Sequence, residues 1–169
     1  MSPEWQSLVE SVRTIIEEHQ DVAPIRLPNL ARALGVPVKA ATLAPGISGE
    51  IRPLNAGGLV IKINRHDPLK RQRFSVAHEL AHFLLHADQI GNGISDDVLY
   101  RSKLSDRREA QANRLAADIL MPDTLVREQI EAAHEKGVGD VLIFLVEKFE
   151  VSEEAMRIKL ENLGIAYAA

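Results

Sequence analysis

The sequence of 169 residues contains no cysteine. Neither a disulfide framework nor a thiolate metal site can therefore form, and zinc fingers are excluded. Any metal ion would have to be bound by histidine, aspartate or glutamate side chains.

Basic and apolar targeting segments are also lacking at the start of the chain. The first twenty residues carry Glu4, Glu10, Glu17 and Glu18 where a secretory signal would have a basic region followed by an apolar run. No apolar stretch approaches the roughly 20 residues that a membrane-spanning helix needs. These absences predict a cytoplasmic protein that does not contact a membrane.

An excess of positive charge is missing as well, because 24 acidic residues outnumber 20 lysines and arginines. The net charge of -4 gives no general attraction to nucleic acid, although residues 62–73 and 101–108 are locally basic. The hydrophobic share of 46% and the charged share of 26% are ordinary for a soluble globular protein. At this length we expect a single domain, residues 1–169.

Hydrophobic periodicity and turn residues predict a small sheet followed by helices, which is the α+β class. The segments ISGEIRPL and LVIKINR, separated by the turn-forming NAGG, are typical of a β-hairpin, and the extended VPVKAATL precedes them. Helices are predicted over residues 3–19, 28–34, about 68–86, about 105–121, 123–136, 140–149 and 152–163. Capping patterns place three helix starts at Ser2–Pro3, Asp67–Pro68 and Ser105 or Asp106. The long segment 87–105 has little periodicity and is predicted to be a lid or to contact a substrate.

Three of the six histidines lie within FSVAHELAHFLLH, residues 74–86. Four residues advance a helix by about 6 Å and return to nearly the same face, so His78 and His82 would point together toward one ion. In this H-E-x-x-H arrangement two histidines bind zinc and Glu79 acts as general base on a water molecule. The alternative is that these are core histidines satisfied by hydrogen bonds, with Glu79 as a surface charge. Ligand spacing with a carboxylate between the histidines favours the metal site.

A catalytic zinc site needs a third protein ligand and an open position for water. His86 stands about 12 Å along a straight helix from His78, too far to share an ion, so it is predicted to support the site or to be structural. The carboxylates that could supply the third ligand are Glu109, Asp118, Asp96 and Asp97. Asn113 lies one turn after the first of these and could orient it or a ligand histidine. Spacing favours Glu109 only modestly and leaves the choice open.

Two stretches, RQRFSVAHELAHFLLH and EAQANRLAADILMP, resemble the ImmA/IrrE family of zinc metallopeptidases, whose signature is an HExxH helix followed by a helix ending in Leu-Met-Pro. The likeness extends to LARALGVPV, to the ISGEI hairpin and to the tail FEVSEEAMRIKLENLG, so it covers about residues 27–164. The family pattern often has glycine where Ala81 stands and a second acidic residue where Gln111 stands. Neither Ala81 nor Gln111 stands at a position where the resemblance implies a metal ligand.

The resemblance implies a zincin-like (minigluzincin) fold, in which a small antiparallel or mixed N-terminal sheet precedes a mostly helical C-terminal part. His78, His82 and Glu109 would bind one Zn²⁺ per chain, with Mn²⁺ as the alternative metal. Glu79 would be the catalytic base, and Asn113 would stand behind the ligands together with His86.

By the same resemblance the chain would be a zinc-dependent endopeptidase of narrow regulatory specificity. It would cleave a helix-turn-helix repressor of the Xre type and so release stress-response or mobile-element genes. Two other functions stay open: a toxin paired with an Xre-type antitoxin, and a non-catalytic repressor-binding regulator with a structural metal.

The implied organisation is a zincin-like core, residues 1–122, followed by a helical, helix-turn-helix-like tail, residues 123–169. Direct DNA binding by this tail is not expected, because acidic side chains offset the basic ones. The acidic side chains are Glu153, Glu154 and Glu161. The basic side chains are Arg157 and Lys159, both of which are predicted to be exposed.

The strand GGLVIKIN directly precedes the H-E-x-x-H helix. An exposed edge there is predicted to hold an extended substrate through main-chain hydrogen bonds. Candidates for stabilising the oxyanion are Tyr100, His66, His86, Arg107 and Arg108.

Overall fold

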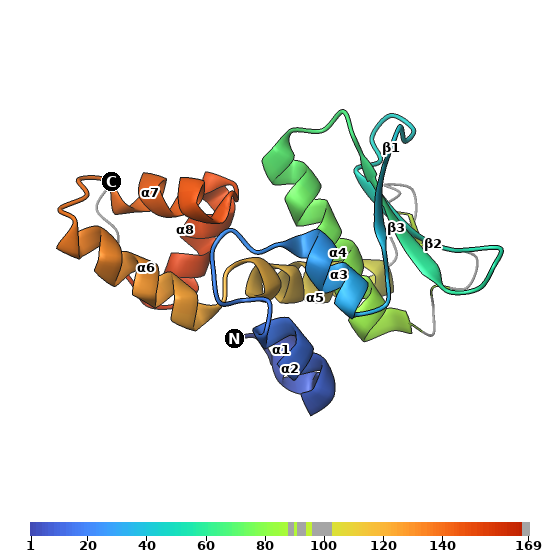
Figure 1. The fold of residues 1–169 in the computed structure, drawn as a ribbon, viewed down its shortest axis with the longest axis horizontal. Coiled ribbons are helices and arrows are strands. Elements are labelled where there is room, and N and C mark those ends of the chain that lie inside the picture. The colour runs from blue at the N-terminus through green and yellow to red at the C-terminus, as the bar shows by residue number, and fades with distance from the viewer. Residues whose placement is uncertain (88–89, 91–93, 96–102, 167–169) are drawn as a thin grey trace.

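The structure, a computed structural model, describes residues 1–87, 90, 94–95 and 103–166. Its strands are β1 (Val38–Ala41), β2 (Gly49–Pro53), β3 (Leu59–Asn64) and β4 (Ile94–Ser95). Its helices are α1 (Pro3–Ser7), α2 (Glu10–Glu17), α3 (Leu27–Ala33), α4 (Leu69–His86), α5 (Lys103–Leu120), α6 (Asp123–Glu135), α7 (Val141–Phe149) and α8 (Glu153–Asn162). The predicted α+β class is confirmed, with the sheet on one side of the molecule and α6–α8 on the other (Figure 1).

The sheet is mixed and has the order β1-β3-β2-β4 (Figure 1). β2 and β3 pair in antiparallel register, which confirms the predicted hairpin. β1 pairs parallel with β3, and β4 pairs antiparallel with β2. Ile51 and Ile61, which face each other across the hairpin, are both fully buried and belong to one core with Leu80 of α4. The sheet therefore fixes the position of α4, the helix that carries the H-E-x-x-H residues.

β3 lies inside the sheet, so the prediction that it offers an exposed edge to a substrate is wrong. β1 pairs with one edge of β3 and β2 pairs with the other. The main-chain groups along both edges of β3 therefore already have partners in neighbouring strands. In the described part of the chain the outer strands are β1 and β4. β4 pairs only with Glu50 and Ile51 of β2.

The helix predicted over residues 3–19 is broken into α1 and α2. Leu8 and Val9 have extended backbones, with ψ angles of 143° and 147°. The break lets α1 pack on α5 while α2 packs on α3, which one straight helix could not do. The predicted Ser2 cap is present, since its hydroxyl accepts from the Trp5 amide.

Two other predicted helix starts differ from the structure. Pro68 rather than Asp67 is the N-cap of α4, and no side chain caps that end. The backbone carbonyl of Asp67 instead accepts from the Gln72 side chain at 2.7 Å, so the residue stabilises the first turn in another way. α5 begins at Lys103, before the predicted Ser105.

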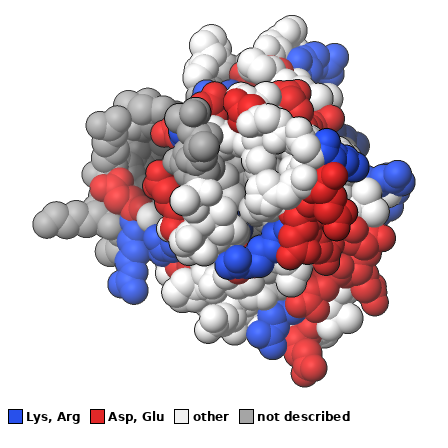
Figure 2. All heavy atoms as spheres, turned by 90° about the vertical axis from the view of Figure 1, so that its left-hand side faces the viewer, with Lys and Arg blue, Asp and Glu red and all other residues white. Residues whose placement is uncertain are grey.

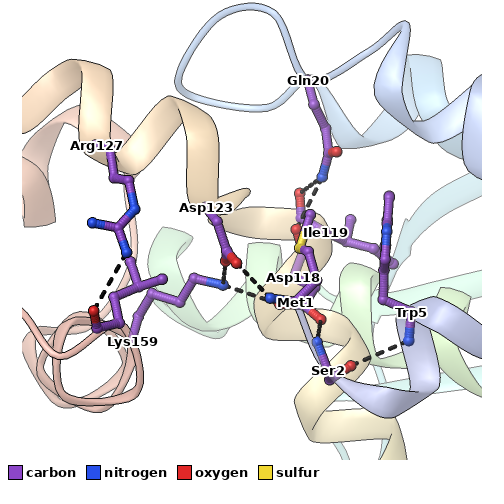
Figure 3. A network of polar contacts seen from close by, with 10 residues as sticks. Met1, Ser2, Trp5, Gln20, Asp118, Ile119, Asp123, Arg127 and Lys159 are labelled. Atoms are coloured by element: carbon purple, nitrogen blue, oxygen red, sulfur yellow. Dashed lines mark hydrogen bonds and ion pairs between the residues drawn. The ribbon is translucent and has the colours of Figure 1, made fainter.

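A polar network centred on Lys159 connects α6–α8 to the rest of the molecule (Figure 3). The Nζ atom of Lys159 lies 3.0 Å from Asp118 Oδ1 and 2.6 Å from Asp123 Oδ1. The amine of Met1 pairs with Asp123, and the Ser2 amide donates to Asp118 Oδ2 at 2.6 Å. The prediction that Lys159 is exposed is wrong, because it is 6% exposed and pairs with the buried Asp118 and the half-buried Asp123.

The same network lowers the pKa of Asp123 and supplies hydrogen bonds to carbonyl groups near the end of α5. Burial alone would raise the pKa of Asp123, but hydrogen bonds from Lys159 and the N-terminal amine hold that pKa below its ordinary value. The Gln20 side-chain amide donates to the carbonyls of Asp118 and Ile119, each at 2.9 Å (Figure 3).

No helix among the described residues has both the length and the hydropathy needed to cross a membrane.

Glu4→Gln is expected to lower the free energy of unfolding by about 1 kcal/mol at neutral pH. Arg114 of α5 donates to both carboxylate oxygens of Glu4, at 2.6 and 3.0 Å, and holds the pKa of Glu4 below its ordinary value of 4.5. Because folding favours the ionised form, this stability is present above pH 4.5 and is lost as the pH falls through the lower pKa of the folded state. Urea unfolding of both proteins at about pH 7 and about pH 3 measures the difference. An equal difference at the two pH values would contradict the ion pair.

Candidate metal centre

α4 carries the H-E-x-x-H residues into the interior of the molecule. It packs against β2 and β3 and also against α5. His78, Glu79 and His82 are 6%, 1% and 3% exposed, so the alternative of Glu79 as a surface charge is wrong. Buried ionisable groups need partners, and the neighbouring helix supplies one.

Glu109 of α5 brings a carboxylate to the two histidines. Its oxygens lie 3.1 Å from His78 Nε2 and 3.2 Å from His82 Nε2, and the two ring nitrogens are 3.0 Å apart. Ligand atoms around a tetrahedral zinc ion stand about 3.4 Å apart when each bond is about 2.1 Å, so only a small outward shift would seat an ion. The side chain of Glu109 is 40% exposed, which leaves the cluster open to water on that side.

In His78 and His82 the Nε2 atom faces the cluster and the Nδ1 atom faces away from it. The hydrogen bond that Nδ1 makes determines whether Nε2 carries a hydrogen or a free lone pair. Nδ1 of His78 donates to Asn113 Oδ1 at 2.9 Å, which leaves Nε2 without a hydrogen. Nδ1 of His82 lies 3.1 Å from Nδ1 of His86, and Nε2 of His86 lies 3.4 Å from Gln111 Oε1. Since an amide oxygen can only accept, His86 donates to Gln111 and accepts from His82.

Lone pairs of His78, His82 and Glu109 therefore converge on one point. Such an arrangement is repulsive unless a cation or a proton lies between the nitrogens and oxygens. When protons lie there, hydrogen bonds from His78 and His82 hold the pKa of Glu109 well below its ordinary value, so its carboxylate is ionised. Burial lowers the pKa of His86, which favours the neutral form that can accept from His82. The donor set therefore fits a divalent metal ion with three protein ligands.

Gly49 of β2 is a residue at this centre that sequence analysis missed. A Cβ atom placed on Gly49 would lie 3.2 Å from the Glu79 Oε1 atom and 3.3 Å from its Cγ. Such contacts are tighter than a Cβ atom normally makes. The carboxylate of Glu79 therefore occupies space that is free because Gly49 has no side chain. No local pattern in ISGEI signals this, because the contact depends on how the strand packs on α4.

Gly49→Ala is expected to reduce cleavage by roughly tenfold or more, because displacing a catalytic group by a fraction of an ångström misaligns it. Zinc content should be unchanged, since the atoms nearest to the added Cβ belong to Glu79 and Ile63 and not to a proposed ligand. Gly139→Ala is the matched control, because a Cβ there meets nothing within 4 Å. Steady-state cleavage and elemental analysis of both variants measure the effect, and wild-type activity in the Gly49→Ala variant would contradict it.

Apart from Arg107 and Arg108, the other residues singled out from the sequence lie away from the cluster or outside the described residues. Asp118 stands nine residues after Glu109, about 13 Å along α5, and is paired with Lys159. His66 contacts Thr42, at 3.3 Å from its Oγ1. Arg107 and Arg108 lie beside Glu109 at the start of α5. The loop predicted as a lid, 87–105, lies largely outside the described residues, and so do Asp96, Asp97 and Tyr100.

Comparisons with known proteins agree with this geometry. The model of the Peptidase_M78 family, described as an IrrE N-terminal-like domain, matches residues 31–161. The chain is 34% identical over 93 residues to the radiation response metalloprotease IrrE of Deinococcus radiodurans, a match that covers 55% of this chain and 28% of that protein. A solved structure of a Mycobacterium tuberculosis transcriptional regulator is similar with a TM-score of 0.56 and 18% identity, over 94% of this chain and 52% of that one. The second likeness concerns the fold alone, and the chain spans less than two thirds of either protein.

Proposed function

The chain belongs to the Peptidase_M78 family, and we propose that it is a zinc-dependent endopeptidase of narrow regulatory specificity. The observation that carries this proposal is the convergence of His78, His82 and Glu109 on one point, with the buried carboxylate of Glu79 next to the first of them. Three protein ligands are the number typical of catalytic zinc, because the fourth position then takes water. Among the described residues the cluster has three protein ligands, whereas a structural zinc site would use four, which argues against the non-catalytic alternative.

Each residue of the centre has a separate role in the proposed reaction. When bound, Zn²⁺ polarises the peptide carbonyl and lowers the pKa of water toward about 7. His78 and His82 would hold it through Nε2 and Glu109 through its carboxylate. Glu79 would accept a proton from the attacking water at a carboxylate oxygen and deliver it to the leaving amine. Asn113 would keep the first histidine in the tautomer that binds metal.

The proposed substrate is a helix-turn-helix repressor of the Xre type, cleaved in the cytoplasm so that repressed genes are released. The family resemblance supports this choice, and the likeness to a radiation response metalloprotease supports a peptidase that acts in a stress response. A toxin that acts on an Xre-type antitoxin would use the same centre.

Direct DNA binding is not part of the proposal. In α8 the basic side chains are already engaged, because Arg157 donates to Glu153 at 2.6 Å and Lys159 is buried between two aspartates. Neither charge is available to a phosphate group without breaking an existing pair.

Elemental analysis of protein purified without chelator tests the metal, and about one zinc per chain is expected. Incubation with the Xre-type repressor encoded beside the gene tests the substrate, with cleavage stopped by a chelator and restored by zinc. A well-folded protein that binds no metal even after zinc is added would refute the peptidase. A zinc-loaded protein that leaves such a repressor intact would refute the substrate. Manganese in place of zinc would change the metal and keep the mechanism.

A further inference from the structure

A cavity of about 730 Å³ lies beside the metal cluster, bordered by the N-terminal residues, α4, α5, α6 and α8. Two of its lining residues contact His78: Asn113 accepts its ring hydrogen at 2.9 Å, and the Phe74 ring centroid lies 6.0 Å away from its ring. The volume is in the range of known ligand sites. The cavity therefore borders the side of His78 that faces away from the cluster, and a polypeptide bound at the metal centre would pass around this histidine to enter it.

Apart from Glu154, the charged groups on the cavity wall already have ion-pair partners. Lys159 is paired with Asp118 and Asp123, as Figure 3 shows, and Arg114 is paired with Glu4. A ligand that offered a charge to these groups would have to compete with existing ion pairs, at a high desolvation cost. The wall therefore selects against charge in the depth of the cavity.

What the wall offers instead is apolar surface. The apolar lining residues are Met1, Pro3, Phe74, Ala117, Ala155, Ile158 and Leu163. Ile158 is 51% exposed, although a large aliphatic side chain is stabilised by leaving water. An apolar group in the cavity would cover it.

The C-terminal segment that supplies part of the cavity wall is acidic. Residues 123–169 contain 10 acidic and 5 basic side chains, a net charge of -5, whereas residues 1–122 contain 14 and 15, a net charge of +1. Figure 2 shows acidic side chains gathered on one side of the face formed by the C-terminal helices. Glu154 brings this charge to the cavity itself, where it is exposed. Positive charge on either side of an apolar group would be attracted to this rim.

We propose that the cavity binds apolar side chains of the polypeptide substrate that are flanked by lysine or arginine. This inference rests on the proposed function, because a polypeptide held at the metal centre is what would extend into the cavity. It adds a substrate preference that the three metal ligands and Glu79 cannot provide, since they act on the peptide group common to all sequences.

Fluorescence polarisation with the zinc-loaded Glu79→Gln variant tests this site without hydrolysis. The probe is a labelled peptide, Lys-Leu-Lys-Leu-Leu-Lys. Replacing its leucines by serine, or its lysines by glutamate, should each weaken binding by about tenfold or more. Adding Ile158→Lys should also weaken binding by about tenfold. The matched control is Ile143→Lys on α7, because Ile143 is 45% exposed and does not line the cavity.

Equal affinity for the leucine and serine peptides would overturn the proposal. Equal losses of peptide affinity with Ile158→Lys and Ile143→Lys would also overturn it. That result would show that the added lysine only repels the lysines of the peptide and that no apolar site is involved. If the neutral dye Nile red binds the cavity and the peptide does not displace it, the occupant is a small apolar molecule and the proposal is again wrong. Failure of wild-type protein to bind zinc or cleave a repressor would be a separate result, because peptide binding is measured on an inactive variant.

Discussion

Glu79→Gln is expected to keep about one zinc per chain while cleavage falls by about 10²- to 10⁴-fold, the usual contribution of a general base. Glutamine has nearly the same shape, so the packing of this fully buried side chain against Gly49 is preserved. An amide cannot accept the proton of the attacking water, because its oxygen is far less basic than a carboxylate. Elemental analysis and single-turnover cleavage, carried out on the same preparation, measure the two properties.

The matched control for this variant is Glu131→Gln, which makes the same chemical change at an exposed position of α6 that does not line the cavity. It should retain metal and retain cleavage within a few-fold. Retained cleavage in Glu79→Gln would remove Glu79 from the mechanism. Loss of zinc from Glu79→Gln would instead show that this carboxylate helps to hold the ion.

Glu109→Ala is expected to weaken zinc binding by more than about 100-fold, since loss of a ligand costs more than loss of a group behind a ligand. The change also removes the negative charge that lies 3.1 and 3.2 Å from the two ring nitrogens. Competition with a chelating dye measures zinc affinity, and thermal unfolding without metal shows whether the fold persists. Cleavage should fall together with the metal content and recover in part at high zinc concentration.

Asp118→Asn is the control for the third ligand, because Asp118 lies on the same helix and was an alternative from spacing. Its carboxylate contacts Lys159 and the Ser2 amide, so the variant should lose about 1–3 kcal/mol of stability and keep its zinc. Weaker zinc binding in Asp118→Asn, with normal binding in Glu109→Ala, would reassign the ligand.

Within α4, the local pattern was sufficient to predict the geometry of the site. His78, Glu79 and His82 lie in one helix, and the period of 3.6 residues alone brings the two histidines together. Glu109 lies 27 residues after His82, so its approach depends on how α5 packs on α4. Spacing left several carboxylates open, and the family resemblance was what singled out this one.

The errors in the fold have the same origin. Alternation of apolar residues predicted β3 as a strand, but it does not reveal how many neighbours a strand has, and β1 covers the edge that was expected to be free. Helical periodicity placed Lys159 on an exposed face, whereas the two aspartates that draw it inward come from other helices. Gly49 and Gln111 matter through contacts with residues that are distant in sequence.

The hydrogen bonds that run from His82 through His86 to Gln111 end on an amide, which carries no charge. An acidic residue, common at this position in the family pattern, would place a negative charge behind the same imidazole and make the ring a stronger electron donor. With glutamine, the centre carries one more unit of net positive charge once a divalent ion is bound. We therefore expect this chain to hold a divalent ion less tightly, and a bound ion would act as a stronger Lewis acid on water and the peptide carbonyl.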